Sequence, residues 1–207
     1  MNNPFSVGRP FSIAIAWAAL LLAGPMLGSC SQAVEAPPLQ GTKIGGPFTL
    51  TDQDGKRVSD NDFAGKYRLI YFGYTFCPDV CPLDVQHLMQ GFKLLEKDDA
   101  ALAAKIQPIF ITVDPARDDP KSLKAFVSAF HPRLIGLTGS EAEIAAVAKE
   151  FAIFYKKQPA ATGASGYLVD HSRQAMLFDP DGKPLALISQ DAKPDAISAE
   201  LQRWARR

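Results

Sequence analysis

The chain of 207 residues has few of the side chains that bind metals or carry out redox chemistry: three cysteines and three histidines. It also has no excess of charge, since 22 basic side chains balance 22 acidic ones. A neutral chain gives no electrostatic reason to expect nucleic acid as a partner. The sequence contains no internal repeat, and its length suits one sizeable core better than two independent domains.

The N-terminus has the pattern of an export signal. An apolar stretch from Phe11 to Leu22 follows Arg9, and its length suits a signal sequence better than a membrane-spanning helix. The stretch Leu27-Gly28-Ser29-Cys30 then resembles the lipobox of bacterial lipoproteins, in which the cysteine carries lipid. An uncleaved anchor over residues 11–27 is the alternative. Either interpretation predicts a bacterial envelope protein on the periplasmic side, tethered to the membrane by lipid at Cys30 or by an N-terminal helix.

After this segment of residues 1–30, the chain divides into a tether and one folded domain. Residues 31–46 are rich in Pro, Ala, Gln and Gly and have little apolar periodicity, so we expect a flexible tether. Residues 47–207 form the predicted domain. The elements expected there are a hairpin at 48–59, a strand at 67–73, a helix after Cys81, a strand at 106–113, a helix from Pro120, a strand at 134–137, a helix capped by Ser140 and Glu143, paired strands at 153–156 and 167–170, paired strands at 173–178 and 184–188, and a last helix near 197–204. This order predicts an α/β, thioredoxin-like three-layer fold with an N-terminal β-hairpin and a mid-domain insertion.

Cys77 and Cys81 are the most informative residues of the domain. They lie four residues apart between a predicted strand and an amphipathic helix, and such a step lets two helical side chains share one face. Near a helix start, we expect both thiols to have a lowered pKa. If Cys30 carries lipid, they are the only thiols left in an oxidising compartment. The pair is therefore either a soft-metal site or a redox dithiol, and the spacing alone does not decide between them.

A third ligand near the two cysteines would favour a metal site over a redox dithiol. His87 falls on the solvent face of the predicted helix, and His131 lies at a helix end where a cation suits the dipole, so we expect surface and structural roles for these two. His171 lies in a loop next to a late strand, and in thioredoxin-like folds that loop faces the dithiol. By this argument His171 is either a metal ligand or an ordinary loop histidine.

Three separate blocks of the domain resemble the Sco/SenC family of copper-binding, thioredoxin-like assembly factors for cytochrome c oxidase. The blocks are Gly73-Tyr-Thr-Phe-Cys77-Pro-Asp-Val-Cys81-Pro82, Thr112-Val-Asp114-Pro-Ala-Arg-Asp118 and Gly166-Tyr-Leu-Val-Asp170-His171. They occur in the family's order, and the resemblance extends from about Pro47 to the C-terminus. It implies that Cys77, Cys81 and His171 hold copper.

Ligand chemistry agrees with this implication. Two thiolates and one imidazole suit three-coordinate Cu(I) and leave an open side for a partner's ligand, while a further donor would allow Cu(II). Asp79 and Asp114 are candidates for outer-shell or partner-facing roles. Alternatively, Asp79 caps the following helix and Asp114 organises a turn before Pro115.

Three functions therefore remain open. The leading hypothesis is a copper metallochaperone that loads the binuclear copper centre of cytochrome c oxidase subunit II and depends on an upstream copper donor or reductant. Such a protein is a carrier and not an enzyme in its main role, and an accessory thiol–disulfide oxidoreductase activity stays open. The second is a thiol–disulfide reductase that keeps the target's cysteines reduced, and the third is a redox or copper sensor. A peroxidase is disfavoured, because nothing marks a peroxide site. We expect the connection from Gln158 to Gly166 to be mobile and to form part of the partner surface.

Overall fold

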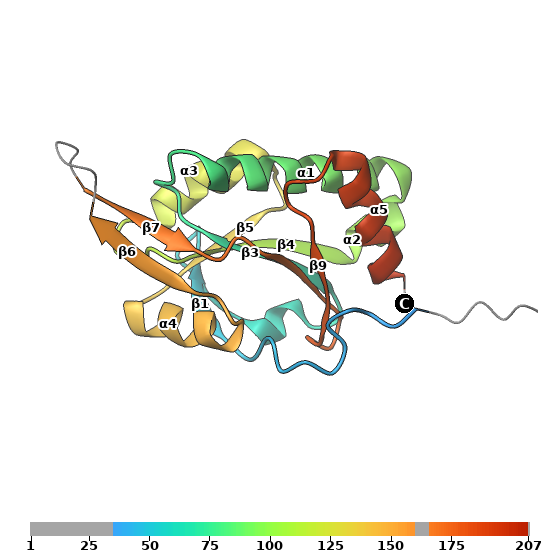
Figure 1. Cartoon of the computed structure of the whole chain (residues 1–207), viewed down its shortest axis with the longest axis horizontal. Helices are drawn as coiled ribbons and strands as arrows, with labels where there is room; N and C mark the ends of the chain where they lie inside the picture. Colours follow the sequence, from blue (N-terminus) through green and yellow to red (C-terminus); the bar gives the residue numbers. More distant parts are fainter. Residues whose placement is uncertain (1–34, 160–165, 207) are drawn as a thin grey trace, which may run out of the picture. The chain divides into compact units, whose positions relative to one another are not determined.

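The computed structural model describes residues 35–159 and 166–206. Cys30, the proposed signal segment and the first residues of the tether lie outside this range. In chain order the elements are β1 (Thr49–Asp52), β2 (Arg57–Ser59), the 3₁₀ helix η1 (Asp60–Phe63), β3 (Tyr67–Gly73), α1 (Val80–Asp98), α2 (Ala100–Ala104), β4 (Ile106–Thr112), α3 (Pro120–Phe130), β5 (Ile135–Thr138), α4 (Glu141–Glu150), β6 (Tyr155–Pro159), β7 (Tyr167–His171), β8 (Ala175–Phe178), β9 (Pro184–Ile188) and α5 (Pro194–Ala205) (Figure 1).

A seven-stranded mixed sheet forms the centre of the domain, in the order β2-β1-β5-β4-β3-β8-β9. Its middle is parallel, with β3 paired to β4 from Tyr67↔Ile106 to Gly73↔Thr112 and β4 paired to β5. Every residue of β3 and of β4 is buried, which explains why both strands read as nearly continuous apolar runs. Because parallel strands end at one edge of the sheet, the segments that follow β3 and β4 lie side by side.

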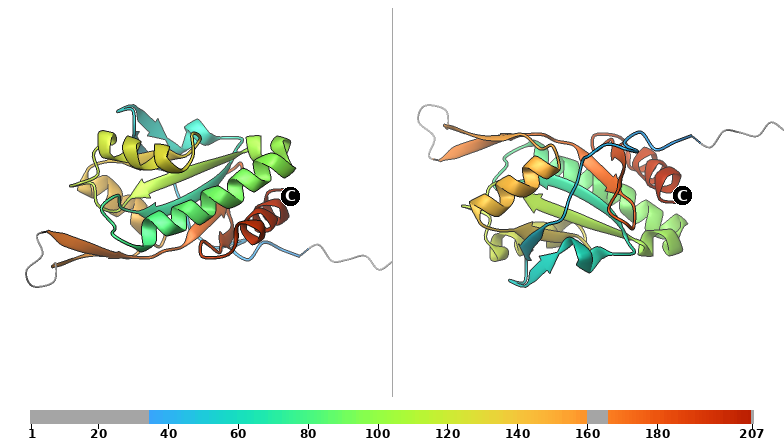
Figure 2. Two further views of the ribbon diagram at one scale, coloured as in Figure 1. Left: turned by 90° about the horizontal axis from the view of Figure 1, so that it is seen from above. Right: turned by 90° about the horizontal axis from the view of Figure 1, so that it is seen from below.

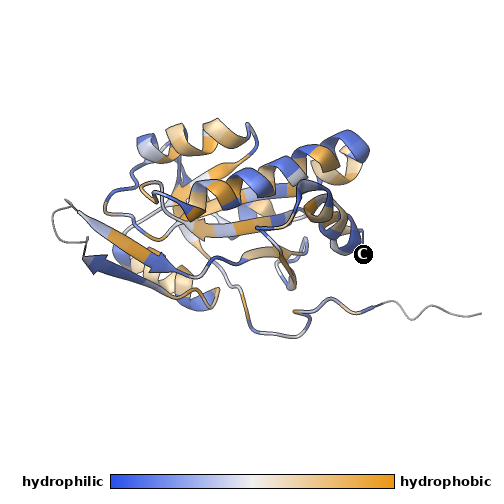
Figure 3. Cartoon of the chain, turned by 45° about the horizontal axis from the view of Figure 1, so that its top comes forward, coloured by the Kyte–Doolittle hydropathy of each residue, from blue (hydrophilic) through white to orange (hydrophobic). Residues whose placement is uncertain are grey.

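Alternate residues of β3 build two separate cores. Leu69 and Tyr71 pack against α1, α3 and α5 on one face, while Ile70 and Phe72 pack against η1 and α4 on the other. Figures 1 and 2 show these helices as layers on opposite sides of the sheet. In Figure 3 the apolar colour gathers on the strands and on the sheet-facing sides of the helices. The predicted thioredoxin-like three-layer fold is confirmed.

Two helices begin where their sequences predict. The Asp119 carboxylate accepts from the backbone N–H of Ser122 at 2.7 Å, with Pro120 in the first turn of α3. Ser140 and Glu143 form the predicted capping box of α4: the Ser140 hydroxyl accepts from Glu143 N–H at 3.2 Å, and the Glu143 carboxylate accepts from Ser140 N–H at 2.7 Å.

The mid-domain insertion is a two-stranded antiparallel ribbon of β6 and β7, outside the main sheet (Figure 2). The predicted pairing is confirmed, although β6 begins at Tyr155 and not at Ile153, because the Ile153 side chain turns into the core. His171 was expected in the loop after this strand, but it is the last residue of β7 and pairs with Tyr155. Residues 160–165, within the connection predicted to be mobile, lie outside the described residues.

The described part of the predicted tether has hydrogen bonds to the domain. Leu39 N–H donates to the Leu185 carbonyl at 3.0 Å, and Gly45 N–H donates to the Glu150 carbonyl at 2.8 Å. The boundaries of signal, tether and domain remain predictions. None of the helices in residues 35–159 and 166–206 combines the length and apolar character that crossing a membrane requires.

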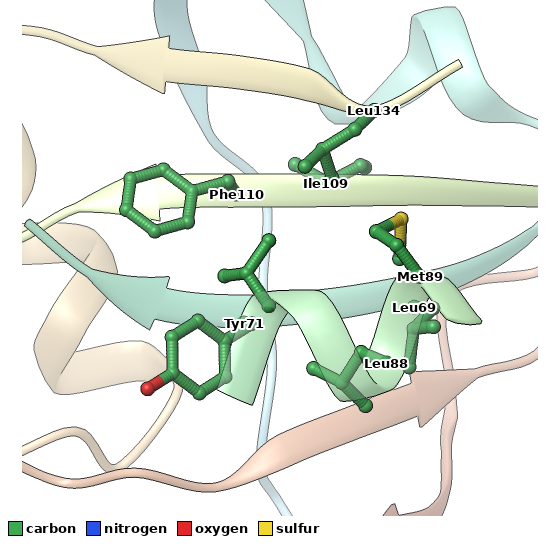
Figure 4. Close-up of a pocket in the computed structure, with 8 residues that line it drawn as sticks. Leu69, Tyr71, Leu88, Met89, Ile109, Phe110 and Leu134 are labelled. Atoms are coloured by element: carbon green, nitrogen blue, oxygen red, sulfur yellow. The ribbon is translucent and has the colours of Figure 1, made fainter. Parts of the chain in front are cut away.

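A small apolar cavity lies between α1 and the sheet (Figure 4). Its lining residues are Leu69, Tyr71, Val85, Leu88, Met89, Ile109, Phe110 and Leu134. The Tyr71 hydroxyl points away from the apolar side chains in this view and donates to the Asp84 carboxylate at 2.7 Å. Tyr71 therefore joins the apolar core to a polar cluster at the end of the sheet where the cysteines lie.

Gly91 sets the distance between α1 and α5, and its replacement tests that packing. A Cβ at this position would lie 2.5 Å from Ile197 Cγ2 and 3.0 Å from the Pro194 carbonyl oxygen. We expect Gly91→Ala to lower the free energy of unfolding, because overpacking costs about 1–3 kcal/mol and outweighs a gain of about 1 kcal/mol in helix propensity. Urea denaturation measures the change. Lys93→Ala, at an exposed site on α1, should shift stability by less than about 0.5 kcal/mol. Stabilisation by Gly91→Ala would contradict the close packing.

Candidate functional site

Cys77 and Cys81 differ in structural setting. Cys77 lies in the loop between β3 and α1 and is half-buried, while Cys81 lies in the first turn of α1 and is fully buried. The two do not share one helical face, because α1 begins only at Val80 and Cys77 precedes it. The two are still neighbours, since the backbone N–H of Cys81 donates to Cys77 Sγ at 3.4 Å.

A buried carboxylate holds the cysteine loop. Asp118 is fully buried and accepts from Thr75 N–H at 2.9 Å, from the Thr75 hydroxyl at 2.6 Å and from the Thr112 hydroxyl at 2.6 Å. Burial raises the pKa of Asp118, and the three hydrogen bonds oppose that shift. The residue fixes the start of the cysteine loop to the end of β4. We did not single it out from the sequence, although it closes the second of the three motif blocks.

His171 lies directly against the cysteine pair. Its Nε2 is 3.0 Å from Cys81 Sγ, and its Nδ1 is 2.8 Å from the Ser172 carbonyl oxygen. A carbonyl accepts only, so Nδ1 carries a proton and donates it to Ser172, and in the neutral ring Nε2 is then the unprotonated nitrogen. The rings of Tyr71 and Tyr74 contact the imidazole in edge-on geometry, at centroid distances of 6.4 and 5.9 Å. The structure thus brings the three predicted ligands together.

The thiols have opposite pKa shifts. A hydrogen bond from the Cys81 thiol lowers the pKa of Cys77 to about 5, helped by the backbone N–H groups of Asp79 and Cys81 and opposed by burial. The same hydrogen bond, together with burial, raises the pKa of Cys81. The expectation of two lowered values is therefore wrong for Cys81, because burial and its role as donor outweigh its position at a helix start.

The three side chains are neighbours but do not form a finished metal cage. Over residues 35–159 and 166–206, no group of three or more His, Cys, Asp or Glu side chains has the arrangement of a formed metal site. A metal ion shared by a sulfur and an imidazole nitrogen would hold them about 3.5 Å apart or more, against the 3.0 Å between Cys81 and His171. The donor set suits a soft metal, and binding would require a small separation of these two side chains.

The two aspartates of the prediction have different surroundings. Asp79 is exposed at the N-cap of α1 but makes no side-chain hydrogen bond to the helix, so the capping role is not observed. Asp114 is fully buried, accepts from the Tyr167 hydroxyl at 2.6 Å and pairs with Arg117. The Arg117 guanidinium stacks on the Tyr167 ring at 3.7 Å and donates to its carbonyl at 2.9 Å. Asp114 therefore joins the segment after β4 to β7, the strand that carries His171.

The other two histidines lie in α1 and after α3. His87 is half-buried, so the expected solvent position is only partly right. His131 is buried, with Nε2 3.1 Å from Glu96 and with Nδ1 accepting from Arg133 N–H at 3.1 Å. An accepting Nδ1 makes it a neutral imidazole, and burial lowers its pKa. The expectation of a cation at this helix end is wrong, while the structural role is confirmed.

The pH dependence of alkylation tests the asymmetry of the thiols. In the reduced, metal-free full chain, we expect the iodoacetamide reaction of Cys77 to rise around pH 5, because the thiolate is the nucleophile and forms as the pH passes the pKa. Rates followed by mass spectrometry give the midpoint. Cys81→Ala removes the donating thiol and should move the midpoint upward, whereas Cys81→Ser keeps a donor and should move it less. A midpoint near the ordinary value of about 8.5 would contradict the arrangement.

Comparisons with known proteins agree with the three motif blocks. The model of the SCO1/SenC family matches residues 36–206. Protein sco1 of Schizosaccharomyces pombe is 37% identical over 160 residues, which cover 77% of this chain and 60% of that protein. The chain therefore spans less than two thirds of that relative's length.

Solved structures are similar over most of the domain. ScoI of Bradyrhizobium japonicum, solved with copper bound, is 42% identical with a TM-score of 0.70 and covers 78% of this chain and 99% of its own. A SCO1/SenC family lipoprotein of Bacillus anthracis is 27% identical with a TM-score of 0.68, covering 84% and 99%. BsSco, described as a member of the Sco family of cytochrome c oxidase assembly proteins, is 28% identical with a TM-score of 0.63, covering 84% and 98%. On the family match and the motif blocks together, the chain belongs to the SCO1/SenC family.

Proposed function

We propose that this protein is a copper metallochaperone that holds copper through Cys77, Cys81 and His171 and delivers it to the binuclear copper centre of cytochrome c oxidase subunit II. The observation that carries the proposal is the 3.0 Å contact of His171 Nε2 with the buried Sγ of Cys81, beside the half-buried, low-pKa Cys77. The copper-bound relative from B. japonicum supports the choice of metal.

The arrangement suits transfer by ligand exchange. Cys81 is fully buried, while Cys77 and His171 are half-buried and so partly accessible from solvent. A partner's ligand can therefore approach from the side of Cys77, and copper can pass without release of a free ion. The dithiol must be reduced before it can bind copper, so a reductant is an expected partner together with a copper donor.

A membrane tether would hold the site close to its target. We propose that export and lipid attachment at Cys30 place the domain on the periplasmic side of a bacterial envelope. The lipobox-like stretch ending at Cys30 supports this, and so does the family member from B. anthracis, which is described as a lipoprotein. An N-terminal membrane helix remains the alternative anchor.

A thiol–disulfide reductase is the second candidate, and the asymmetry of the thiols favours it. Cys77 as thiolate would attack a target disulfide, form a mixed disulfide and release one target thiolate. Cys81, after losing its proton, would then attack Cys77 Sγ and release the second. Two electrons pass to the target, which gains two thiols, and Cys77 and Cys81 end as a disulfide.

Removal of His171 separates the two functions. We expect His171→Ala to weaken copper binding to the reduced full chain by more than the 10–100-fold that loss of an outer-shell partner typically causes. Competition with a Cu(I) chelator measures the affinity. The rate of exchange with a disulfide substrate should stay within about twofold of the parent protein, because both thiols remain. His87→Ala is the matched control and should change neither value.

Two results would overturn the proposed chaperone function. One is failure of the reduced parent protein to bind one equivalent of copper. The other is an unchanged copper affinity in His171→Ala, which would leave the cysteines as a dithiol without the proposed third ligand.

The anchor is tested by Cys30→Ser. In a bacterial host we expect this variant to lose the mass of the lipid and to leave the membrane fraction, as shown by intact mass spectrometry and fractionation. The parent protein expressed in parallel should remain with the membrane. Retention of the variant with no difference in mass would exclude lipid at Cys30 and favour the N-terminal helix.

A further inference from the structure

We propose that Asp84 and Arg173 are positioning residues that hold the loop from β7 to β8 against α1 and so keep the imidazole of His171, at the end of β7, directed at the cysteines. This inference rests on the proposed copper function for its purpose, but not for its geometry. Neither residue belongs to the three motif blocks.

Asp84 is a carboxylate in an otherwise apolar position of α1. Only 2% of the residue is exposed, and it lies one helical turn after Cys81. A buried carboxylate is costly unless charged partners and hydrogen bonds satisfy it. The Asp84 carboxylate accepts three hydrogen bonds: from the Tyr71 hydroxyl at 2.7 Å, from Arg173 Nε at 2.9 Å and from Arg173 Nη2 at 2.6 Å. The two-pronged contact with one guanidinium fixes direction as well as distance.

Arg173 lies two residues after His171, in the connection from β7 to β8. The intervening Ser172 accepts the Nδ1 proton of His171 at its carbonyl, and its N–H donates to the Phe154 carbonyl at 2.9 Å. The ion pair therefore acts on a segment already joined to the imidazole by hydrogen bonds. A shift of Arg173 would move the carbonyl that selects the His171 tautomer.

The first turns of α1 and the segment from His171 to Arg173 are thus connected twice. Cys81 contacts His171 at 3.0 Å, and one turn along α1 Asp84 contacts Arg173. Tyr71 contacts both connections: its ring lies edge-on to the His171 imidazole, and its hydroxyl donates to the Asp84 carboxylate. A single contact would leave the loop free to pivot, whereas two contacts fix the orientation of the ring.

Copper binding should depend on this pair without any direct contact to the metal. Thiolates alone can hold Cu(I), but the imidazole provides the third donor and is needed most by Cu(II). If the loop moves, the cysteines remain and the imidazole is presented only part of the time. Loss of such outer-shell support typically costs 10–100-fold in metal affinity.

The test uses the full chain, reduced, with and without copper. For Arg173→Ala we expect Cu(I) affinity to fall by about 10–100-fold and the nitrogen coupling of His171 in the Cu(II) electron paramagnetic resonance spectrum to weaken. In the metal-free protein, ¹⁵N resonances of the His171 ring should change from a fixed Nδ1–H tautomer to averaged values. Arg173→Lys, which keeps the charge but not the two-pronged contact, should restore part of each signal.

Two further variants separate positioning from folding. Arg57→Ala breaks an exposed ion pair with Glu143 far from the cysteines in sequence and should leave all three signals unchanged. The double variant Asp84→Leu with Arg173→Met replaces the pair by apolar packing, which often preserves stability, and should still lose the fixed tautomer. A parental tautomer and parental copper affinity in both Arg173→Ala and the double variant would overturn the proposal. If the parent protein binds no copper, the proposed function fails, while the metal-free ring resonances still decide whether the pair positions His171.

Discussion

The parallel pairing of β3 with β4 is the constraint on which the rest of the domain depends. Seven residues of each strand are in register and buried on both faces, so neither strand can shift without exposing one of the two cores. Both strands end at the same edge of the sheet. The loop that carries Cys77 leaves one strand there, and the turn that carries Asp114 and Asp118 leaves the other. The position of the site is therefore a consequence of core packing.

Buried carboxylates then connect the outlying parts of the site to this frame. Asp118 holds the start of the cysteine loop, Asp114 holds β7 through Tyr167, and Asp84 holds the residues after His171. The hydrogen bonds and ion pairs of these aspartates offset the cost of burying their carboxylates, and each aspartate joins segments that are distant in the chain. In a thiol–imidazole site the ligands come from a loop, a helix and an outlying ribbon, so polar contacts of this kind determine how far they lie from one another.

Local patterns were sufficient to predict most of the fold. Apolar periodicity and caps such as Asp119 and Ser140 depend on neighbours a few residues away, and the structure has the elements they predict. The closeness of His171 to the cysteines followed from the order of elements and the family resemblance. The ion pair of Asp84 and Arg173 could not be predicted, because it joins residues 89 positions apart and breaks the apolar pattern of α1. The opposite shifts of the two thiols were missed for a similar reason, since burial and donor direction are set by the tertiary structure.

The Cys81 thiol that contacts His171 at 3.0 Å carries a proton in the metal-free protein. The raised pKa of the buried Cys81 thiol keeps that proton bound at neutral pH. Copper entering the site must displace it, so metal and proton are competitors for the same sulfur lone pairs. The strength with which such a site retains copper then falls as its surroundings become more acidic.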